Sequence, residues 1–327
     1  MSAEHPSAKQ PHDEFSLIGW IGQQASDHSE VMLGIGDDTA VLRVSPDHAR
    51  LATVDTLMEG VHFTMPPATA QQVGHKALAV NLSDIAAMAG RPQAALVSLV
   101  LPKQDGAAIA QGIHTGIQTL ADTHNVAIAG GDTNTWNGPL VVSITVLGET
   151  GCRQTGQHAA VPRSGAQAGD WIMVTGTLGG SLAGKHLDFQ PRLTEARTLN
   201  QSVSLHAMID VSDGLSADLH HILHQSRVGA IVEATSIPIS AAADHADDGR
   251  SPLEHALCDG EDFELLFCVN PQDGQNLLSD PPFETRLTKI GEITHTESCQ
   301  LKTSLGHLEK LPAQGWRHPF DAPSHDA

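Results

Sequence analysis

Apolar and polar residues follow two rhythms along the chain, an alternation typical of β-strands and a three-to-four-residue spacing typical of helices. In the first half, apolar or alternating runs predict strands at residues 31–34, 40–44, 51–55, 94–101, 126–129 and 140–147. Helical spacing predicts a short helix from Glu14 and longer helices over about 70–89, with Thr69 as N-cap, and over 109–123. The first half is therefore expected to form a mixed sheet with helices.

The second half mixes strands and helices again. Strands are predicted at 171–175, 230–234, 263–269 and 286–293, and helices after Gly180, at 193–201 and at 215–225, with an exposed polar loop at 242–250. Between the halves, residues 148–169 become rich in Gly, Gln, Ala and Arg, which is typical of a domain boundary. We expect an α/β (mixed α+β) protein with a disordered leader, a mixed-sheet N-terminal domain and an α/β sandwich C-terminal domain, over residues 1–13, 14–150 and 151–327.

Charge narrows the range of partners. The chain has 38 acidic and 18 basic residues and a formal net charge of −20. This argues against nucleic acid, whose phosphates are bound by Lys and Arg. A small phosphorylated ligand stays open, provided that metal ions carry positive charge.

Cysteine spacing and apolar runs indicate the compartment. The four cysteines are widely spaced, with no C-x-x-C, which supports neither a disulfide framework nor a zinc site. The longest apolar run, 94–101, is too short to span a bilayer, and the first 14 residues contain no apolar signal region. We expect a cytoplasmic protein without a membrane partner.

Six aspartates stand at the ends of predicted elements, beside glycine, or inside the long helix: Asp38, Asp55, Asp84, Asp132, Asp210 and Asp213. Any one of them is ordinary, because Asp is common at turns and helix N-caps. Carboxylates at loop positions are also the hard oxygen ligands that Mg²⁺ takes together with substrate phosphates and water. Their recurrence favours one shared magnesium site.

Other ligand and nucleophile motifs are weak. Gly179–Lys185 nearly spells a phosphate-binding loop, but His186 stands where that loop needs a Ser or Thr hydroxyl for Mg²⁺. Gly34–Thr39 does not fit the dinucleotide-binding pattern. The sequence has no G-x-S-x-G, and Cys258 has no identifiable base.

A second acidic run precedes the apolar residues 265–267. Alternation along the predicted strand places Asp262 and Glu264 on one face and Glu261 on the other. Two interpretations remain open for this run, a solvated strand edge and a contact with a ligand.

Seven motifs occur in a fixed order between Glu14 and Trp316, at residues 34–38, 55–63, 76–88, 130–133, 163–166, 209–215 and 260–267. Together they resemble the thiamine-monophosphate kinase family, within the superfamily of aminoimidazole-ribonucleotide synthetase-like ATP-binding proteins. The segment Asp55–Phe63 distinguishes this family from its relatives. The resemblance implies transfer of a phosphoryl group from ATP to thiamine monophosphate, which gives thiamine diphosphate and ADP. It also implies two α/β domains and a homodimer formed through the N-terminal sheets.

The resemblance assigns roles to individual residues. It implies that several Mg²⁺ ions are bound by Asp38, Thr53, Val54, Asp55, Asp84, Asp132, Asp210 and Asp213. It implies that ATP is contacted by Gly131, Asp132, Arg163 and Ser212, and thiamine monophosphate by His62, Glu261 and Trp316. No general base or covalent nucleophile is expected, because the acceptor phosphate has a second pKa near ~6 and is mostly ionised at neutral pH. Asp37 has no assigned role and is expected to shape its loop.

The chain departs from the family pattern at several positions. Val54 stands where the family often has Thr or Ser, so only its carbonyl oxygen is available to a metal. Asp259 replaces a glycine and Phe263 a tyrosine, and the usual Gly-Leu is Gly184-Lys185. Two alternatives stay open: a module that binds ATP without transferring phosphate, and another ATP-dependent enzyme of the superfamily. Of the latter, selenophosphate synthetase and the hydrogenase-maturation relative are disfavoured because the cysteines that they need are absent.

Overall fold

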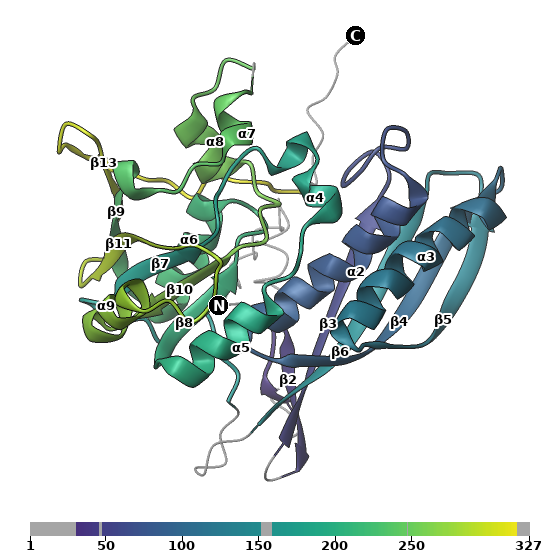
Figure 1. Ribbon diagram of the computed structural model, residues 1–327, viewed down its shortest axis with the longest axis horizontal. Coiled ribbons are helices and arrows are strands. Elements are labelled where there is room, and N and C mark those ends of the chain that lie inside the picture. The colour runs from purple at the N-terminus through teal and green to yellow at the C-terminus, as the bar shows by residue number, and fades with distance from the viewer. Residues whose placement is uncertain (1–30, 46–47, 152–158, 247, 319–327) are drawn as a thin grey trace, which may run out of the picture.

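The structure is a computed structural model that describes residues 31–45, 48–151, 159–246 and 248–318. Figure 1 shows two sheets side by side, with helices α2 (Ala70–Ala87) and α5 (Leu193–Ser202) between them. The expected mixed α/β architecture with two sheet-containing halves is confirmed. The leader and the short helix expected from Glu14 lie outside the described residues. No helix of the described part is long and apolar enough to cross a membrane.

The first sheet has six strands in the order β1-β2-β3-β6-β4-β5. Their bounds are Val31–Leu33, Ala40–Ser45 and His48–Met58 for β1 to β3, and Arg91–Pro102, Ala127–Trp136 and Val141–Gly151 for β4 to β6. Only β4 and β5 pair in parallel, and the other neighbours are antiparallel. Strand β3 is in the middle of the sheet, whereas β5 forms an edge.

Helices α2 and α3 (Gly106–His124) cover one face of this sheet (Figure 1). Helix α2 begins at a capping box, in which the Thr69 hydroxyl accepts from the Gln72 amide and the Gln72 side chain accepts from the Thr69 amide. The two helices approach closely because glycines face the contact. A Cβ on Gly116 would lie 1.9 Å from the Gln71 carbonyl oxygen, and a Cβ on Gly74 would lie 2.1 Å from the Ile113 carbonyl oxygen.

The opposite face of the first sheet is uncovered in the single chain. Val54 is 61% exposed, Leu96 44% and Met58 38%. The strand predicted at 94–101, the longest apolar run of the chain, is only half-buried, because helices cover just one of its faces.

The second sheet has seven strands in the order β13-β12-β9-β11-β7-β10-β8. In chain order they are β7 (Trp171–Thr175), β8 (Leu205–Asp210), β9 (Gly229–Glu233), β10 (Leu265–Val269), β11 (Leu287–Thr294), β12 (Cys299–Lys302) and β13 (Leu308–Lys310). The helical elements are η1 (Ser181–Ala183), α4 (Lys185–Asp188), α5, α6 (Leu215–Ser226), η2 (Ala234–Ser236), α7 (Ala241–Asp244), α8 (Pro252–Cys258) and α9 (Pro271–Ser279).

The two faces of the second sheet belong to different cores. Met173, Met208 and Phe267 join the cluster that contains α2 and the first sheet. Ile172 and Val174 point the other way, into a separate core with α6 and α8. Helix α2 is consequently packed between both sheets, which explains why even Lys76 on this helix is fully buried.

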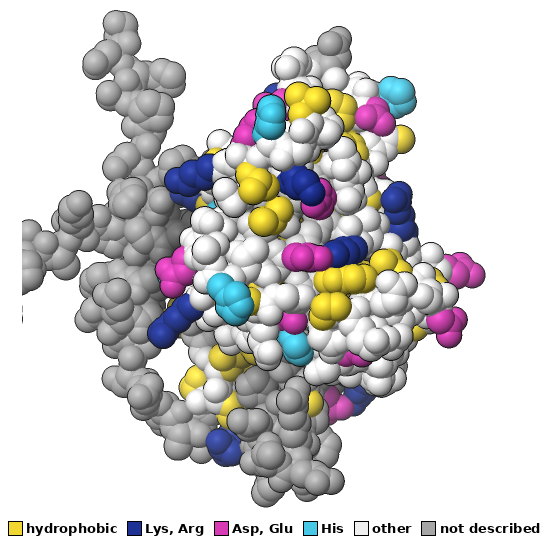
Figure 2. All heavy atoms as spheres, turned by 90° about the vertical axis from the view of Figure 1, so that its left-hand side faces the viewer, with side chains coloured by type: hydrophobic (Ala, Val, Ile, Leu, Met, Phe, Trp, Pro, Cys, Tyr) yellow, Lys and Arg dark blue, Asp and Glu magenta, His cyan; other side chains and the backbone are white. Residues whose placement is uncertain are grey.

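Figure 2 shows the side of the molecule formed by the second sheet and its helices. Basic side chains there lie among acidic ones and do not gather into a basic patch. Pairs such as Lys289–Glu292 (2.6 Å) and Lys302–Glu233 (3.0 Å) show this local balance of charge.

Three local expectations are wrong. Residues 261–264 do not form a strand, because Glu261 and Phe263 have positive φ angles and β10 begins only at Leu265. The helix expected after Gly180 is reduced to the short η1 and α4, since Gly184 interrupts it with a φ of 135°. The polar insert at 242–250 opens with the short helix α7 rather than being loop throughout.

Candidate functional site

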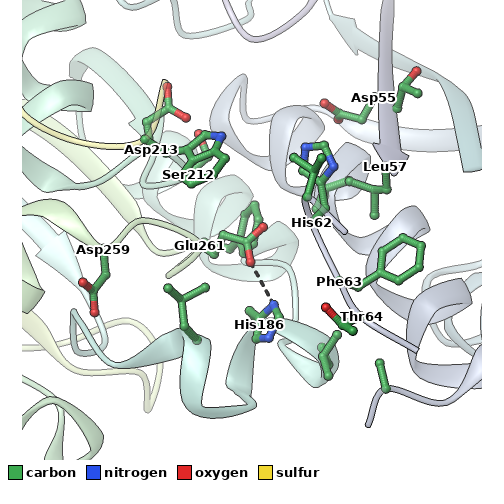
Figure 3. A pocket seen from close by; sticks show the side chains of 18 of the residues that line it. Asp55, Leu57, His62, Phe63, Thr64, His186, Ser212, Asp213, Asp259 and Glu261 are labelled. Carbon is green, nitrogen blue, oxygen red and sulfur yellow. Dashed lines mark ion pairs between the residues drawn. The ribbon is translucent and has the colours of Figure 1, made fainter. Parts of the chain in front are cut away.

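A cavity of about 710 Å³ lies where residues from both halves of the chain meet (Figure 3). One side is formed by β3 and the loop that follows it, including Asp55 and His62. The other side is formed by the loop after β8, by α4 and by the segment before β10, including Ser212 and Glu261. In Figure 3, Asp55 and Asp213 lie at one end of the cavity, and Glu261 and His186 lie at the other. The first end thus carries two aspartates, whereas the second carries a glutamate beside a histidine.

Next to Asp55, behind the lining of the acidic end, lies a cluster of aspartates from distant parts of the chain. Carboxylate oxygens of Asp38, Asp84 and Asp210 lie within 4.8 Å of one another. The Thr53 hydroxyl donates to Asp84, and the Ser83 hydroxyl donates to Asp210 at 2.6 Å. These aspartates come from the loop before β2, from α2 and from the end of β8, so the packing of α2 between the two sheets brings them together.

Desolvation governs the charge of this cluster. It raises the pKa of Asp55 to about 6, although a hydrogen bond with Asp84 partly offsets it, and raises the pKa of Asp210 to about 8. The pKa of Asp84 is also well above its usual range, through desolvation and then the charges of Asp55 and Asp210. Carboxylates that repel one another out of water are stabilised by a cation. The oxygen-only donor set fits Mg²⁺.

Arg163 belongs to this cluster. Its guanidinium donates to both oxygens of Asp38, at 2.7 and 3.1 Å, and its backbone amide donates to Asp37 at 2.7 Å. Desolvation would lower the pKa of Arg163, but the charge of Asp38 outweighs it and raises the pKa. Asp37 therefore holds the loop against residue 163, in agreement with the expectation that it shapes the loop.

A second group of possible metal ligands lies beside the first. Ligand atoms of Asp213, Asp218 and His221 are within 4.8 Å of one another. Asp218 accepts from the amides of Asp213 and Gly214, at 3.1 and 3.0 Å, and desolvation followed by the charge of Asp213 raises its pKa well above the usual range. Desolvation also lowers the pKa of His221 to about 4, so its ring is neutral at pH 7. Sequence reasoning missed Asp218 as a site residue, although it follows Asp213 by five residues.

The other end of the cavity is built around Glu261. Its carboxylate contacts the Lys76 ammonium with both oxygens at 2.7 Å and lies 2.8 Å from His186 Nδ1. His62 faces the same cavity and accepts from the Met58 amide through Nδ1 at 3.0 Å. Trp316 is half exposed at the rim, where its backbone amide donates to the Asp213 carbonyl at 2.9 Å. The three residues expected at the substrate end thus line one cavity.

In the loop that resembles a phosphate-binding loop, the backbone amides already donate to carboxylates of the protein itself. The Gly179 amide donates to both oxygens of Asp262, at 2.9 and 3.0 Å, and the Gly180 amide donates to Asp259 at 3.1 Å. Lys185 pairs with Glu264 at 3.0 Å. Internal carboxylates take these donors and this cation, which supports the expectation that this loop is not a phosphate-binding loop.

Three expected site residues lie away from the acidic cluster in the single chain. The Val54 side chain points to the uncovered face of the first sheet. Asp132 lies on that same face of β5, because the register aligns it with Ser98, Ser143 and Thr56 across the strands. Three strand spacings of ~4.8 Å separate β5 from β3, or about 14 Å. Gly131, next in the chain, is equally distant.

Comparison with known proteins connects this geometry to characterised relatives. The family models for the AIR synthase related protein match residues 36–150 with the N-terminal domain and residues 167–303 with the C-terminal domain. A thiamine-monophosphate kinase of Rhodopirellula baltica is 41% identical and covers 93% of this chain and 97% of its own. The thiamine-monophosphate kinase of Bacillus subtilis is 34% identical and covers 94% of this chain and 99% of its own.

Solved structures give the same picture. AaThiL complexed with AMPPCP and TMP matches with a TM-score of 0.80 and 28% identity, over 97% of this chain and 100% of that chain. The thiamine-monophosphate kinase of Stenotrophomonas maltophilia matches with a TM-score of 0.69 and 35% identity, over 90% of this chain and 98% of that chain.

Proposed function

This chain belongs to the thiamine-monophosphate kinase family of AIR synthase related proteins, and we therefore propose that its cavity is where a phosphoryl group is transferred from ATP to thiamine monophosphate. The reaction forms thiamine diphosphate and ADP. The observation that carries the proposal is the cavity between the two halves of the chain. One end has Asp55 and Asp213 with the aspartate cluster beside them, and the other end has His62, Glu261 and Trp316.

The principal difficulty of this reaction is repulsion between two phosphorylated molecules. At ~4 Å and an effective dielectric constant of ~20, each pair of unit charges costs about 4 kcal/mol. The two cations of the family motifs do not relieve this repulsion, since Lys76 is paired with Glu261 and Arg163 with Asp38. Positive charge must therefore come from bound metal.

We assign that role to Mg²⁺, which when bound offsets the phosphate charges and orients the reacting oxygens. Its ligands would be the carboxylates of the acidic end, namely Asp38, Asp55, Asp84 and Asp210, with Asp213 and Asp218 beside them. Thr53 and Ser83 orient two of these carboxylates through hydrogen bonds. Val54 contributes only its main-chain carbonyl, because its side chain faces away. The acceptor phosphate needs no general base, since its second pKa is ~6.

We also propose a homodimer formed through the uncovered face of the first sheet. This face exposes Val54, Leu96 and Met58, and large apolar side chains exposed on one face of a sheet are typical of an interface. If two copies pair through this face, Asp132 of the partner subunit would approach β3 from the side on which the Val54 side chain lies. Gly131 of the partner subunit, its neighbour in the chain, would come with it. The site would then combine residues from both subunits.

The division into a leader 1–13 and domains 14–150 and 151–327 remains our proposal and is supported by two sheets that share no strand. A cytoplasmic location is likewise proposed. It is supported by Cys258, Cys268 and Cys299, which are free.

The activity is tested by incubating the full chain with ATP, Mg²⁺ and thiamine monophosphate and quantifying ADP and thiamine diphosphate by chromatography. We expect equal amounts of both products, and none when Mg²⁺ is replaced by excess chelator. Thermal stabilisation by ATP without any diphosphate would contradict the proposal and indicate a module that binds ATP without transferring phosphate.

A further inference from the structure

The least expected feature of the cavity is a fully buried lysine beneath its substrate end. Lys76 is 0% exposed, on the central turns of α2. Its ammonium contacts four atoms: both oxygens of Glu261 at 2.7 Å, the His62 carbonyl oxygen at 2.7 Å and His186 Nδ1 at 2.9 Å. An ammonium has three donors and no acceptor, so these contacts use it completely. Lys76 therefore has no proton left to offer to a ligand.

His186 completes this arrangement from the other half of the chain. Its Nδ1 lies 2.8 Å from Glu261 and 2.9 Å from the Lys76 ammonium, so it donates to the first or accepts from the second according to its tautomer. Figure 3 shows His186 directed at Glu261 from α4. In either tautomer the imidazole fixes the position of the ion pair.

The ion pair also fixes the charge and orientation of Glu261. Desolvation would raise the pKa of this carboxyl group, but the hydrogen bond with His186 and the charge of Lys76 outweigh it and lower the pKa. A carboxylate has about four lone-pair sites, of which Lys76 uses one on each oxygen. When His186 donates to Oε2, the free site is on Oε1. Glu261 is then an acceptor whose charge is neutralised by Lys76 and whose one free lone-pair site has a fixed direction.

We propose that Lys76 and His186 are positioning residues that hold the Glu261 carboxylate as an oriented acceptor for an N–H group of the substrate's ring system. Thiamine monophosphate has one suitable donor, the amine on its pyrimidine ring. This inference rests on the proposed function and adds two residues to it. Because Lys76 comes from α2 and Glu261 and His186 from the C-terminal half, the acceptor is assembled only where the two halves meet.

Lys76→Met and His186→Ala test this proposal, with kcat and KM measured separately for thiamine monophosphate and for ATP. Loss of an oriented hydrogen bond of about 1.4 kcal/mol corresponds to a factor of about 10, so Lys76→Met should raise KM for thiamine monophosphate by about tenfold or more. His186→Ala should change it in the same direction by about threefold to tenfold. KM for ATP and the Mg²⁺ concentration for half-maximal activity should stay within about twofold, because the metal site is at the other end.

A substrate analogue separates positioning from mere structural support. In this analogue a carbonyl oxygen replaces the ring amine, so it accepts a hydrogen bond where the substrate donates one. Without Lys76 the desolvated, half-buried Glu261 binds a proton more readily, and its protonated form can donate to that oxygen. The preference in kcat/KM for the amine over the carbonyl compound should therefore fall by about tenfold or more in Lys76→Met. A purely structural role would slow both compounds equally.

Lys185→Met is the matched control. Lys185 is the neighbour of His186 in α4 and pairs with a buried glutamate, Glu264, at 3.0 Å, but it does not line the cavity. Its loss should leave KM for thiamine monophosphate unchanged. If Lys76→Met does not fold, the double variant Lys76→Met/Glu261→Gln replaces the unpaired carboxyl group by an amide that cannot ionise, and should restore the melting temperature without restoring the preference.

The outcomes are distinct. An unchanged KM and an unchanged preference in His186→Ala together with either Lys76 variant would overturn the inference while leaving the proposed function intact. A wild-type chain that forms no thiamine diphosphate would overturn the proposed function itself.

Discussion

Carboxyl groups that are buried to a similar degree have pKa values shifted in opposite directions in this protein, because their neighbours differ. Desolvation raises the pKa of Asp210 to about 8, because only the Ser83 hydroxyl and a more distant Arg163 oppose it. Glu264 is 1% exposed, yet its pKa is lowered, because Arg192 and Lys185 outweigh desolvation. Glu264 stays ionised because of its two cationic partners. Asp210 accepts no hydrogen bond from a cation among the described residues, and its charge is one that a metal ion would stabilise.

Asp55→Asn is the sharpest single test of the metal assignment. Asn keeps the size of the side chain but lacks the negative charge that binds Mg²⁺, so the rate of thiamine diphosphate formation should fall by about 100-fold or more. Removing a desolvated acid should leave the unfolding temperature equal or higher. Nearly full activity in a steady-state assay, with circular dichroism showing an intact fold, would refute the role of Asp55.

Asp262→Asn gives a pH-dependent prediction outside the metal site. Desolvation raises the pKa of Asp262 to about 7, although the Gly179 amide opposes it. Between its unfolded value of 3.8 and about 7 the folded state holds a proton that the unfolded state has lost, so wild-type stability should fall with rising pH by up to roughly 1.4 kcal/mol per unit and level off above 7.

The Asn variant cannot titrate and should lack this contribution. Urea unfolding at pH 5, 6, 7 and 8 gives the difference in unfolding free energy between wild type and variant. That difference should shift steadily against the wild type between pH 5 and 7. A difference that is constant over this range would contradict a raised pKa.

Sequence reasoning reached part of this residue-level picture. The recurrence of aspartates correctly identified Asp38, Asp84 and Asp210 as neighbours, because strand ends and a central helix bring them together. It did not identify His186 as a site residue. The sequence showed only that His186 stands where a phosphate-binding loop needs Ser or Thr. Its partner Glu261 is 75 positions away in sequence, and the two meet only in the folded chain, where both contact Lys76.

At the scale of elements, α2 determines how the site is assembled. It carries Lys76 and Asp84, one for each end of the cavity, and packs against both sheets. The apolar spacing over the predicted helix 70–89 favours one buried face, and the residues of that face are buried: Val73, Ala77, Val80 and Met88. The remaining faces are buried as well, because the second sheet covers them, and this contact is not encoded in the pattern of one helix.

Gly116→Ala tests the close contact between α2 and α3. The added Cβ would lie 1.9 Å from the Gln71 carbonyl oxygen, so the helices must separate, and we expect a loss of about 1–3 kcal/mol in the free energy of unfolding. Gly106→Ala, at the start of the same helix, meets only the Leu101 side chain at 3.4 Å and should change stability by less than about 1 kcal/mol. Chemical denaturation of both variants measures the difference. Equal values would show that the contact has no energetic role.

The elements missed by sequence reasoning have a common physical reason. β8 has only six residues at the edge of the second sheet, and α8 has only seven. Such short segments contain too few turns or alternations for periodicity to stand out. Their local signals were nevertheless present: Ser251 and Glu254 form a capping box before α8, and Asn270-Pro271 begins α9. Capping chemistry predicts the start of these helices better than their apolar spacing does.

At the scale of the whole molecule, one expected metal ligand lies apart from the aspartate cluster, on the uncovered face of the first sheet. Asp132 lies on the uncovered face of the first sheet, about three strand spacings from β3, or roughly 14 Å. The family resemblance gave Asp132 the same role as Asp55, and the sequence contains no sign that they lie on different faces. The predicted strand ended at residue 129, so the face on which residue 132 lies could not be read from alternation. The homodimer that we propose would account for this difference, because Asp132 of the partner subunit would approach β3 from the side of Val54, next to Asp55 in the chain.

Mixed dimers test this account directly. Asp55→Asn and Asp132→Asn should each be inactive alone. If each site combines Asp55 of one subunit with Asp132 of the other, refolding the two variants together gives mixed dimers with one intact site, and activity should recover to about a quarter of the wild-type value. Asp55→Asn refolded with Asp84→Asn is the control and should stay inactive, because both residues belong to the same site of one chain. No recovery in the first mixture, with dimers shown by light scattering, would place Asp132 outside a shared site.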